Sequence, residues 1–203
     1  MVEALKPSKK DALNMLLAGL VVGTGFAAYR DVTSPGRFMA VTLLGPLAVF
    51  FRELGQRTVA HFMEADVHTE LSTEGSVTTL LVAFLSYISV FSLALLIPVS
   101  SGYSNRSYEN WGKGIDAIWA KREYWLAASG ITTLLIAWLL SFIAGFQVLA
   151  EMTALFAFFQ LLPLDEEKSF CGKLDGAYII LWSGFMWLIF TGLTIIALTV
   201  SVL

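Results

Sequence analysis

Residues 50–60 read Phe-Phe-Arg-Glu-Leu-Gly-Gln-Arg-Thr-Val-Ala and place four strongly polar side chains inside a long apolar run. Arg52 and Gln56 stand four residues apart, and so do Glu53 and Arg57, so a helix here carries two adjacent polar stripes. Charges inside a membrane are costly, and they mark either a functional site or a buried network of paired side chains. We expect both stripes to face the interior of a helix bundle, mainly as a network that joins helices.

The rest of the chain indicates that this run lies in a membrane. Of the 203 residues, 57% are hydrophobic and 14% are charged, whereas soluble domains have about 45–50% apolar and about 25% charged residues. This composition excludes an ordinary soluble globular protein, and a net charge of −3 leaves no basic surface for nucleic acid. Cys171 is the only cysteine, so the chain forms no internal disulfide.

Six apolar segments are separated by short stretches that hold most of the charges and turn residues. A helix that crosses a bilayer needs about 20 mostly apolar residues, so these segments predict an all-α polytopic membrane protein with five to six transmembrane segments. The chain 1–203 then forms a single integral membrane domain with a polar loop over 99–124. The predicted segments are 11–29, 38–63, 77–98, 125–144, 147–163 and 177–203.

A second polar element lies far along the sequence, where Gln160-Leu161-Leu162-Pro163 is followed by Leu174-Asp175-Gly176. Together with Arg52-Glu53-Leu54-Gly55-Gln56, this order resembles the H-E-L-G-H and N-L-L-P…L-D-G motifs of the site-2 protease family of intramembrane zinc metalloproteases. In that family the two histidines and the aspartate bind zinc, and the glutamate is the general acid/base. The resemblance covers most of the chain and implies a site-2-protease-like core with a short β-like tract, Val67–Leu71, after the second helix.

The departures from the family lie at the chemical positions. Arg52 and Gln56 replace both histidines, and the family's G-P-x-x-N corresponds to Ser129-Gly130-Ile131-Thr132-Thr133. Zinc needs deprotonated N, S or O donors, but Arg offers only N–H donors and a permanent positive charge, and the amide of Gln is a poor ligand. We therefore expect no bound metal, no cofactor and no catalytic residue, with Glu53 as a vestige of the catalytic set.

In place of zinc, we expect the guanidinium of Arg52 to pair with Asp175 and with Glu53. Burying these carboxylates without a cation costs several kcal/mol each, so the arginine keeps the former metal site folded. The former metal-site positions are then Arg52, Gln56 and Asp175, and the buried polar network is Arg52, Glu53, Gln56, Arg57 and Asp175.

A second group of potential metal ligands follows the motif helix: His61, Glu64, Asp66, His68 and Glu70. His61 and His68 are seven residues apart, and a predicted helix end and strand start lie between them. This spacing argues against a shared metal ion, so we expect a solvated membrane edge instead.

The distribution of Lys and Arg favours one orientation in the membrane. If all six segments cross, eight of these cations lie on one side and three on the other, whereas a re-entrant 77–98 makes the ratio nine to two. Because cytoplasmic loops carry the excess of Lys and Arg, we predict that 77–98 re-enters and that the N-terminus and loop 99–124 are cytoplasmic. In either arrangement the sequon Asn105-Arg106-Ser107 falls on the inner side, so we expect it to stay unglycosylated. The nine cytoplasmic cations are Lys6, Lys9, Lys10, Arg106, Lys113, Lys121, Arg122, Lys168 and Lys173, and the outer two are Arg30 and Arg37.

The leading functional hypothesis is a catalytically inactive member of the site-2 protease family that acts as a helix-binding or scaffold subunit of a larger membrane complex. Its expected surroundings are the lipid bilayer and other integral membrane proteins, contacted through transmembrane helices, in the cell membrane of a prokaryote. Two alternatives stay open: an active intramembrane metalloprotease with atypical ligands, and a small membrane transporter whose pathway the buried charges would line. Six small residues allow close helix packing, with a partner or within the chain: Gly19, Gly23, Gly25, Gly130, Gly184 and Gly192.

Overall fold

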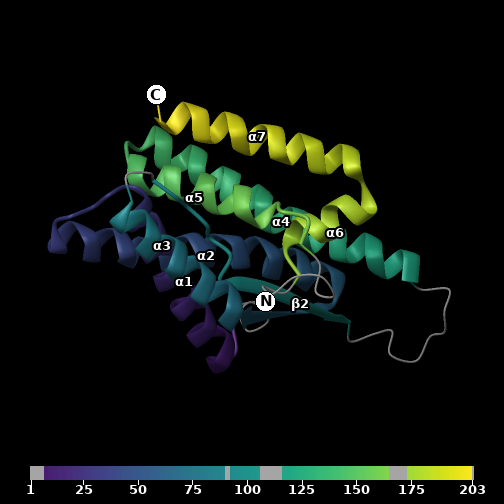
Figure 1. Ribbon diagram of the computed structural model, residues 1–203. Coiled ribbons are helices and arrows are strands. Elements are labelled where there is room, and N and C mark those ends of the chain that lie inside the picture. The colour runs from purple at the N-terminus through teal and green to yellow at the C-terminus, as the bar shows by residue number, and fades with distance from the viewer. Residues whose placement is uncertain (1–6, 90–91, 106–115, 165–172, 203) are drawn as a thin grey trace.

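The computed structural model describes residues 7–89, 92–105, 116–164 and 173–202 (Figure 1). In chain order its elements are α1 (Lys9–Tyr29), α2 (Pro35–Met63), β1 (Ala65–Leu71), α3 (Thr73–Ile88), β2 (Val99–Asn105), α4 (Asp116–Ile143), α5 (Gln147–Gln160), α6 (Asp175–Trp182) and α7 (Gly184–Val202). Most described residues are helical, and α1, α2, α4 and α7 each contain a stretch long and apolar enough to cross a membrane. The helical, membrane-spanning class is thus supported, while the count of five to six crossings stays a prediction.

The sequence explains where α2, the helix with the polar stripes, starts and ends. Pro35 occupies the first turn after Ser34, where its missing N–H removes no helical hydrogen bond. At the other end Glu64 adopts a left-handed backbone with a φ of 53°, and this turn leads directly into β1. The predicted tract Val67–Leu71 lies inside that strand.

β1 and β2 form a two-stranded antiparallel sheet, and this pairing closes the segment between them. Leu71 pairs with Val99, and Ser72 N donates to Pro98 O at 3.0 Å. Residues 72–98 therefore leave the sheet and return to the same point, which is the shape expected of a re-entrant segment.

The predicted apolar segment 77–98 is not one continuous helix. α3 ends at Ile88, and residues 92–98 return along it without helical structure. Leu93 N donates to Ser86 Oγ at 3.0 Å and Ile97 N donates to Thr79 Oγ1 at 3.3 Å. These bonds satisfy two backbone N–H groups of the non-helical return, which lipid would leave unpaired.

Two other segment predictions are wrong in their detail. The predicted segment 177–203 is two helices, α6 and α7, because Ser183 has an extended backbone. Its hydroxyl accepts from Met186 N at 3.3 Å, so the serine caps the start of α7. The predicted loop 99–124 contains β2 and the beginning of α4.

α5 has only 14 residues, fewer than the about 20 that cross a bilayer as one helix.

α1 and α2 pack so closely that a side chain at their contact has no room. A Cβ atom on Gly45 of α2 would meet the backbone of Gly19 and Gly23 on α1. By contrast, a Cβ atom on Gly184 or Gly192 of α7 would meet no other segment of the described chain within 4 Å. Internal packing therefore occupies four of the six small residues named above, namely Gly19, Gly23, Gly25 and Gly130.

α2 packs between α1 and α4, while α7 lies along the outside of the bundle beside α4 and α5 (Figure 1). The largest apolar core joins α1, α2 and α5 through fully buried side chains such as Val22, Phe26, Val49 and Phe156. The central position of α2 is what brings its polar stripes into the interior.

Candidate functional site

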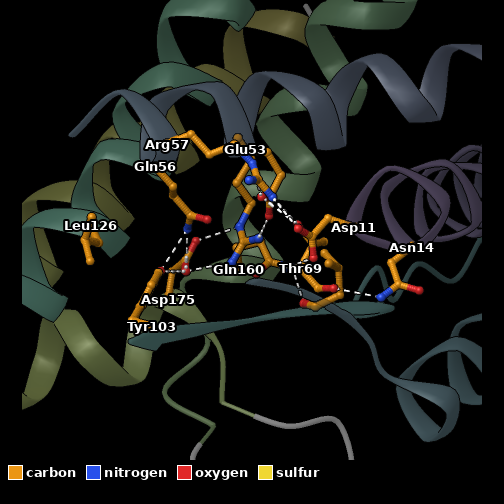
Figure 2. Close-up of polar contacts among 12 residues, drawn as sticks. Asp11, Asn14, Glu53, Gln56, Arg57, Thr69, Tyr103, Leu126, Gln160 and Asp175 are labelled. Atoms are coloured by element: carbon orange, nitrogen blue, oxygen red, sulfur yellow. Dashed lines mark hydrogen bonds and ion pairs between the residues drawn. The ribbon is translucent and has the colours of Figure 1, made fainter. Parts of the chain in front are cut away.

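Arg52 and Asp175 form the centre of a buried polar cluster. Figure 2 shows Asp175 beside Gln56 and Tyr103 in this cluster. Arg52 lies within α2, and Asp175 is the first residue of α6. Arg52 Nε and Nη2 donate to Asp175 Oδ2 and Oδ1, each at 2.7 Å, so the guanidinium holds the carboxylate through two parallel hydrogen bonds. Both side chains are fully buried. The structure thus places in contact the two residues that the sequence analysis paired.

Three side chains on two elements, α2 and β1, surround the carboxylate of Glu53. Arg52 Nη1 donates to Glu53 Oε1 at 3.2 Å, and Thr69 Oγ1 of β1 donates to Glu53 Oε2 at 2.7 Å. Arg57 Nε, one turn further along α2, lies 3.5 Å from the same oxygen. Each carboxylate oxygen of Glu53 therefore already has a hydrogen-bond donor from within the chain.

Gln56 connects the α2 stripe to β2. Its Nε2 donates to Asp175 Oδ1 at 3.1 Å and to Tyr103 Oη at 3.0 Å, and Tyr103 Oη donates to Asp175 Oδ1 at 3.2 Å. Loss of hydration and the nearby charge of Asp175 raise the pKa of Tyr103 well above its usual value, so the phenol stays protonated. Tyr103 was not predicted as a site residue, because only the strand pairing brings it beside Asp175.

Arg57 belongs to an outer layer of the cluster, on the side of α1. Its Nη2 donates to Thr69 Oγ1 at 3.3 Å and lies 3.5 Å from Asp11 Oδ2. The backbone of Thr69 is held as well, since its N–H donates to Asp11 Oδ1 at 3.3 Å and its carbonyl accepts from Asn14 Nδ2 at 2.8 Å. The sequence analysis did not predict Asp11, Asn14 or Thr69 as site residues: it considered the first helix for its apolar length and small residues, and the tract around Thr69 only as a strand.

Two more residues of the family-like motifs line the cluster. A Cβ atom on Gly130 of α4 would come within 2.9 Å of Gln56 Nε2, so the missing side chain leaves room for the polar stripe of α2. Gln160, the last residue of α5, is fully buried and its Nε2 donates to Val99 O at 3.4 Å. Its Oε1 has no hydrogen-bond partner among the described residues.

The side chains of this cluster do not suit a metal ion. Arg52 and Gln56 present N–H groups to the centre of the cluster, and both oxygens of Asp175 already accept hydrogen bonds from these two side chains. A cation placed here would meet the guanidinium charge. Across the residues that the structure describes, no three His, Cys, Asp or Glu side chains gather as a metal site would require, and this includes the tract that holds His61 and His68.

Comparison with known proteins adds no relative to this picture: no family model, no curated protein and no solved structure matches the chain. The geometry of the cluster therefore carries the functional argument.

Proposed function

We propose that this chain is a catalytically inactive, site-2-protease-like membrane protein that acts as a helix-binding or scaffold subunit of a larger membrane complex. The observation that carries the proposal is the bidentate contact of Arg52 with Asp175, which Gln56 joins. These three residues occupy the positions that resemble the zinc ligands of the family, and they meet although more than a hundred residues separate α2 from α6. A guanidinium at this meeting point supplies the positive charge that a metal would supply.

The chemistry of the cluster supports the loss of hydrolysis. Metal-assisted hydrolysis needs a metal-bound water beside a general base. Glu53 is the only residue that resembles that base, and its oxygens accept from Arg52 and Thr69 instead. The side chains that would position water and metal in a protease here connect α2, α6 and the sheet. This arrangement supports a structural role and not a catalytic one.

Metal analysis of the purified protein tests this proposal. We expect no stoichiometric zinc in the wild-type chain and no cleavage of transmembrane peptides. The variant Arg52→His/Gln56→His places two imidazoles one turn apart beside Asp175, so it is expected to gain about one zinc per chain. Gln56→His alone is the matched control and should stay metal-free, because Arg52 keeps its charge. Stoichiometric zinc in the wild type, lost together with peptide cleavage in Asp175→Ala, would identify an active metalloprotease instead.

The scaffold role needs a separate experiment, because the absence of zinc does not test whether the protein associates with other membrane proteins. We expect the full chain, solubilised in a mild detergent, to co-purify with one or more integral membrane proteins in a fixed ratio. A photo-crosslinker at Leu188 on the exposed face of α7, where 61% of the residue is accessible, should join the chain to the same protein. The buried position Ala18 is the control. A chain that purifies alone and crosslinks only to lipid would contradict the proposal.

The proposed orientation places the sheet end of the bundle in the cytoplasm. Lys10 precedes Asp11, which contacts β1, and Lys173 lies 4.0 Å from the ring centre of Tyr178, which packs against Tyr103 of β2. Lys6, Arg106, Lys113, Lys168, Cys171 and the sequon positions 106–107 lie outside the described residues. With 72–98 re-entrant, the proposal counts five crossings, of which the short α5 together with the residues after it provides one.

A further inference from the structure

A groove of about 480 Å³ opens on a different face of α2 from the polar cluster. Arg52, Glu53 and Gln56 point to one side of the helix, whereas Leu54 and Thr58 point to the other. α4 forms the second wall and α7 the third. The side chains that define the groove are Leu54, Thr58, Ala128, Thr132, Met186 and Phe190.

The threonine and serine hydroxyls that line this groove are bonded within their own helices. Thr58 Oγ1 donates to Leu54 O at 2.6 Å, and Thr132 Oγ1 donates to Ala128 O at 2.8 Å. Ser129 behaves in the same way, donating to Leu126 O at 2.7 Å. Each of these three hydroxyls is satisfied by its own helix, so these walls of the groove suit an apolar occupant.

Aromatic side chains line one part of the groove, and an exposed lysine precedes them on α4. Trp125 and Trp182 are 47% and 43% exposed, and both contact the ring of Tyr124, at centroid distances of 5.1 Å and 6.4 Å. Exposed Trp rings of this kind settle at the headgroup level of a bilayer. Lys121 is exposed and lies one helical turn before Trp125, on the face of α4 that continues into Ala128 and Thr132.

We propose that the groove binds one acyl chain of an anionic phospholipid, with the lipid phosphate held by Lys121. An apolar groove close to two exposed Trp rings and a Lys suits an amphiphile with an anionic head. A partner helix fits less well, since a helix of 20 residues is about 30 Å long and about 10 Å across, several times the volume of the groove. This inference is independent of the proposed scaffold role.

Native mass spectrometry of the full, delipidated chain in detergent tests the headgroup contact. Titration with phosphatidylglycerol is expected to give a one-to-one adduct, about fivefold tighter than with phosphatidylcholine, from the attraction of one lysine near the membrane surface. Lys121→Gln should remove this preference. Lys10→Gln is the matched control, because Lys10 is also exposed at the same end of the bundle but lies on α1.

Filling the groove tests the acyl-chain contact. Thr132→Trp and, from the other wall, Thr58→Phe should each abolish the one-to-one adduct, whereas Ile136→Trp should retain it, because Ile136 is 51% exposed one turn further along α4 and outside the groove. Circular dichroism establishes that each variant is folded. Equal binding of both lipids to the wild type, or an unchanged adduct in the two folded groove-filling variants, would overturn the proposal. A partner helix crosslinked at position 132 without a lipid adduct would overturn it as well.

Discussion

The carboxylate of Asp175 is the most heavily bonded group of the cluster. It accepts hydrogen bonds from Arg52, Gln56 and Tyr103, and no part of its side chain reaches solvent. Hydrogen bonds to a charged group contribute about 1.5–3 kcal/mol each, but they only offset the cost of removing the charge from water. Removing one partner should therefore be costly, although the intact pair is not a large net source of stability.

The two partners should depend on each other energetically. Arg52→Met and Asp175→Leu are each expected to lower the free energy of unfolding by ~3–5 kcal/mol, because each leaves an unpaired buried charge. The double variant leaves neither charge and should cost less than the two changes added together, by ~0.5–3 kcal/mol. Thermal unfolding in detergent measures all three.

Arg37→Met is the control for this cycle, because Arg37 is exposed and its replacement should change stability by no more than about 0.5 kcal/mol. Strictly additive effects of Arg52→Met and Asp175→Leu would contradict the coupling. Glu53, which accepts a hydrogen bond from Arg52 Nη1, would then be the main partner of Arg52.

Only part of this cluster was predictable from the sequence. Arg52 and Asp175 were paired because both stand at motif positions, and the i,i+4 spacing predicted that Glu53 and Arg57 lie together. Tyr103 and Thr69 carry no such signal. The register of the sheet, in which Tyr103 pairs with Val67, places them in the cluster. The sequence alone does not show which residues of two distant strands pair.

At the scale of elements, the closest contact is that between α1 and α2. The backbone of Gly19 and Gly23 lies where a Cβ atom on Gly45 would stand. Gly45→Val is therefore expected to separate the helices and lower the free energy of unfolding by at least ~1–3 kcal/mol, the range for overpacked cores. Thermal unfolding and the yield of monodisperse protein in detergent measure the effect.

Gly192→Val is the matched control, since a Cβ atom there would meet no other segment of the described chain within 4 Å. It should leave the unfolding temperature unchanged or raise it slightly, because Val is a better helix former than Gly. Equal loss of stability in both variants would indicate a general intolerance of glycine replacement and would contradict the packing argument.

The apolar runs in the sequence predict the presence of helices more reliably than the positions at which these helices end. Residues 177–203 contain only a Ser183-Gly184 pair as an interruption, and this signal is no stronger than other serines and glycines within apolar runs. The extended return over 92–98 is apolar in sequence, so composition alone favours a helix. It is stable because Ser86 and Thr79 on α3 accept its backbone N–H groups, a tertiary effect that no local pattern shows.

At the scale of the molecule, side-chain contacts assign loops to two opposite ends. The start of α1 meets β1 through Asp11 and Thr69, and Arg122 near the start of α4 donates to Met63 O at the end of α2. At the other end Arg30 Nη2 lies 2.9 Å from Glu151 Oε2. This grouping is the one that a re-entrant 72–98 requires, because full crossing would move the start of α4 to the opposite end from β1.

Cysteine accessibility therefore tests the architecture as a whole, in a background carrying Cys171→Ser. We expect Lys10→Cys, Glu74→Cys and Lys121→Cys to be protected from an impermeant maleimide added outside intact cells and to react after permeabilisation. Arg37→Cys, at the opposite end, should react at once. All four positions are exposed on the protein, so a difference between them reports the side of the membrane and not burial. A difference in accessibility between Lys10→Cys and Lys121→Cys would show that 72–98 crosses fully. The nine-to-two count of cations would then no longer compare the two sides of the membrane, which is the comparison that the positive-inside rule makes.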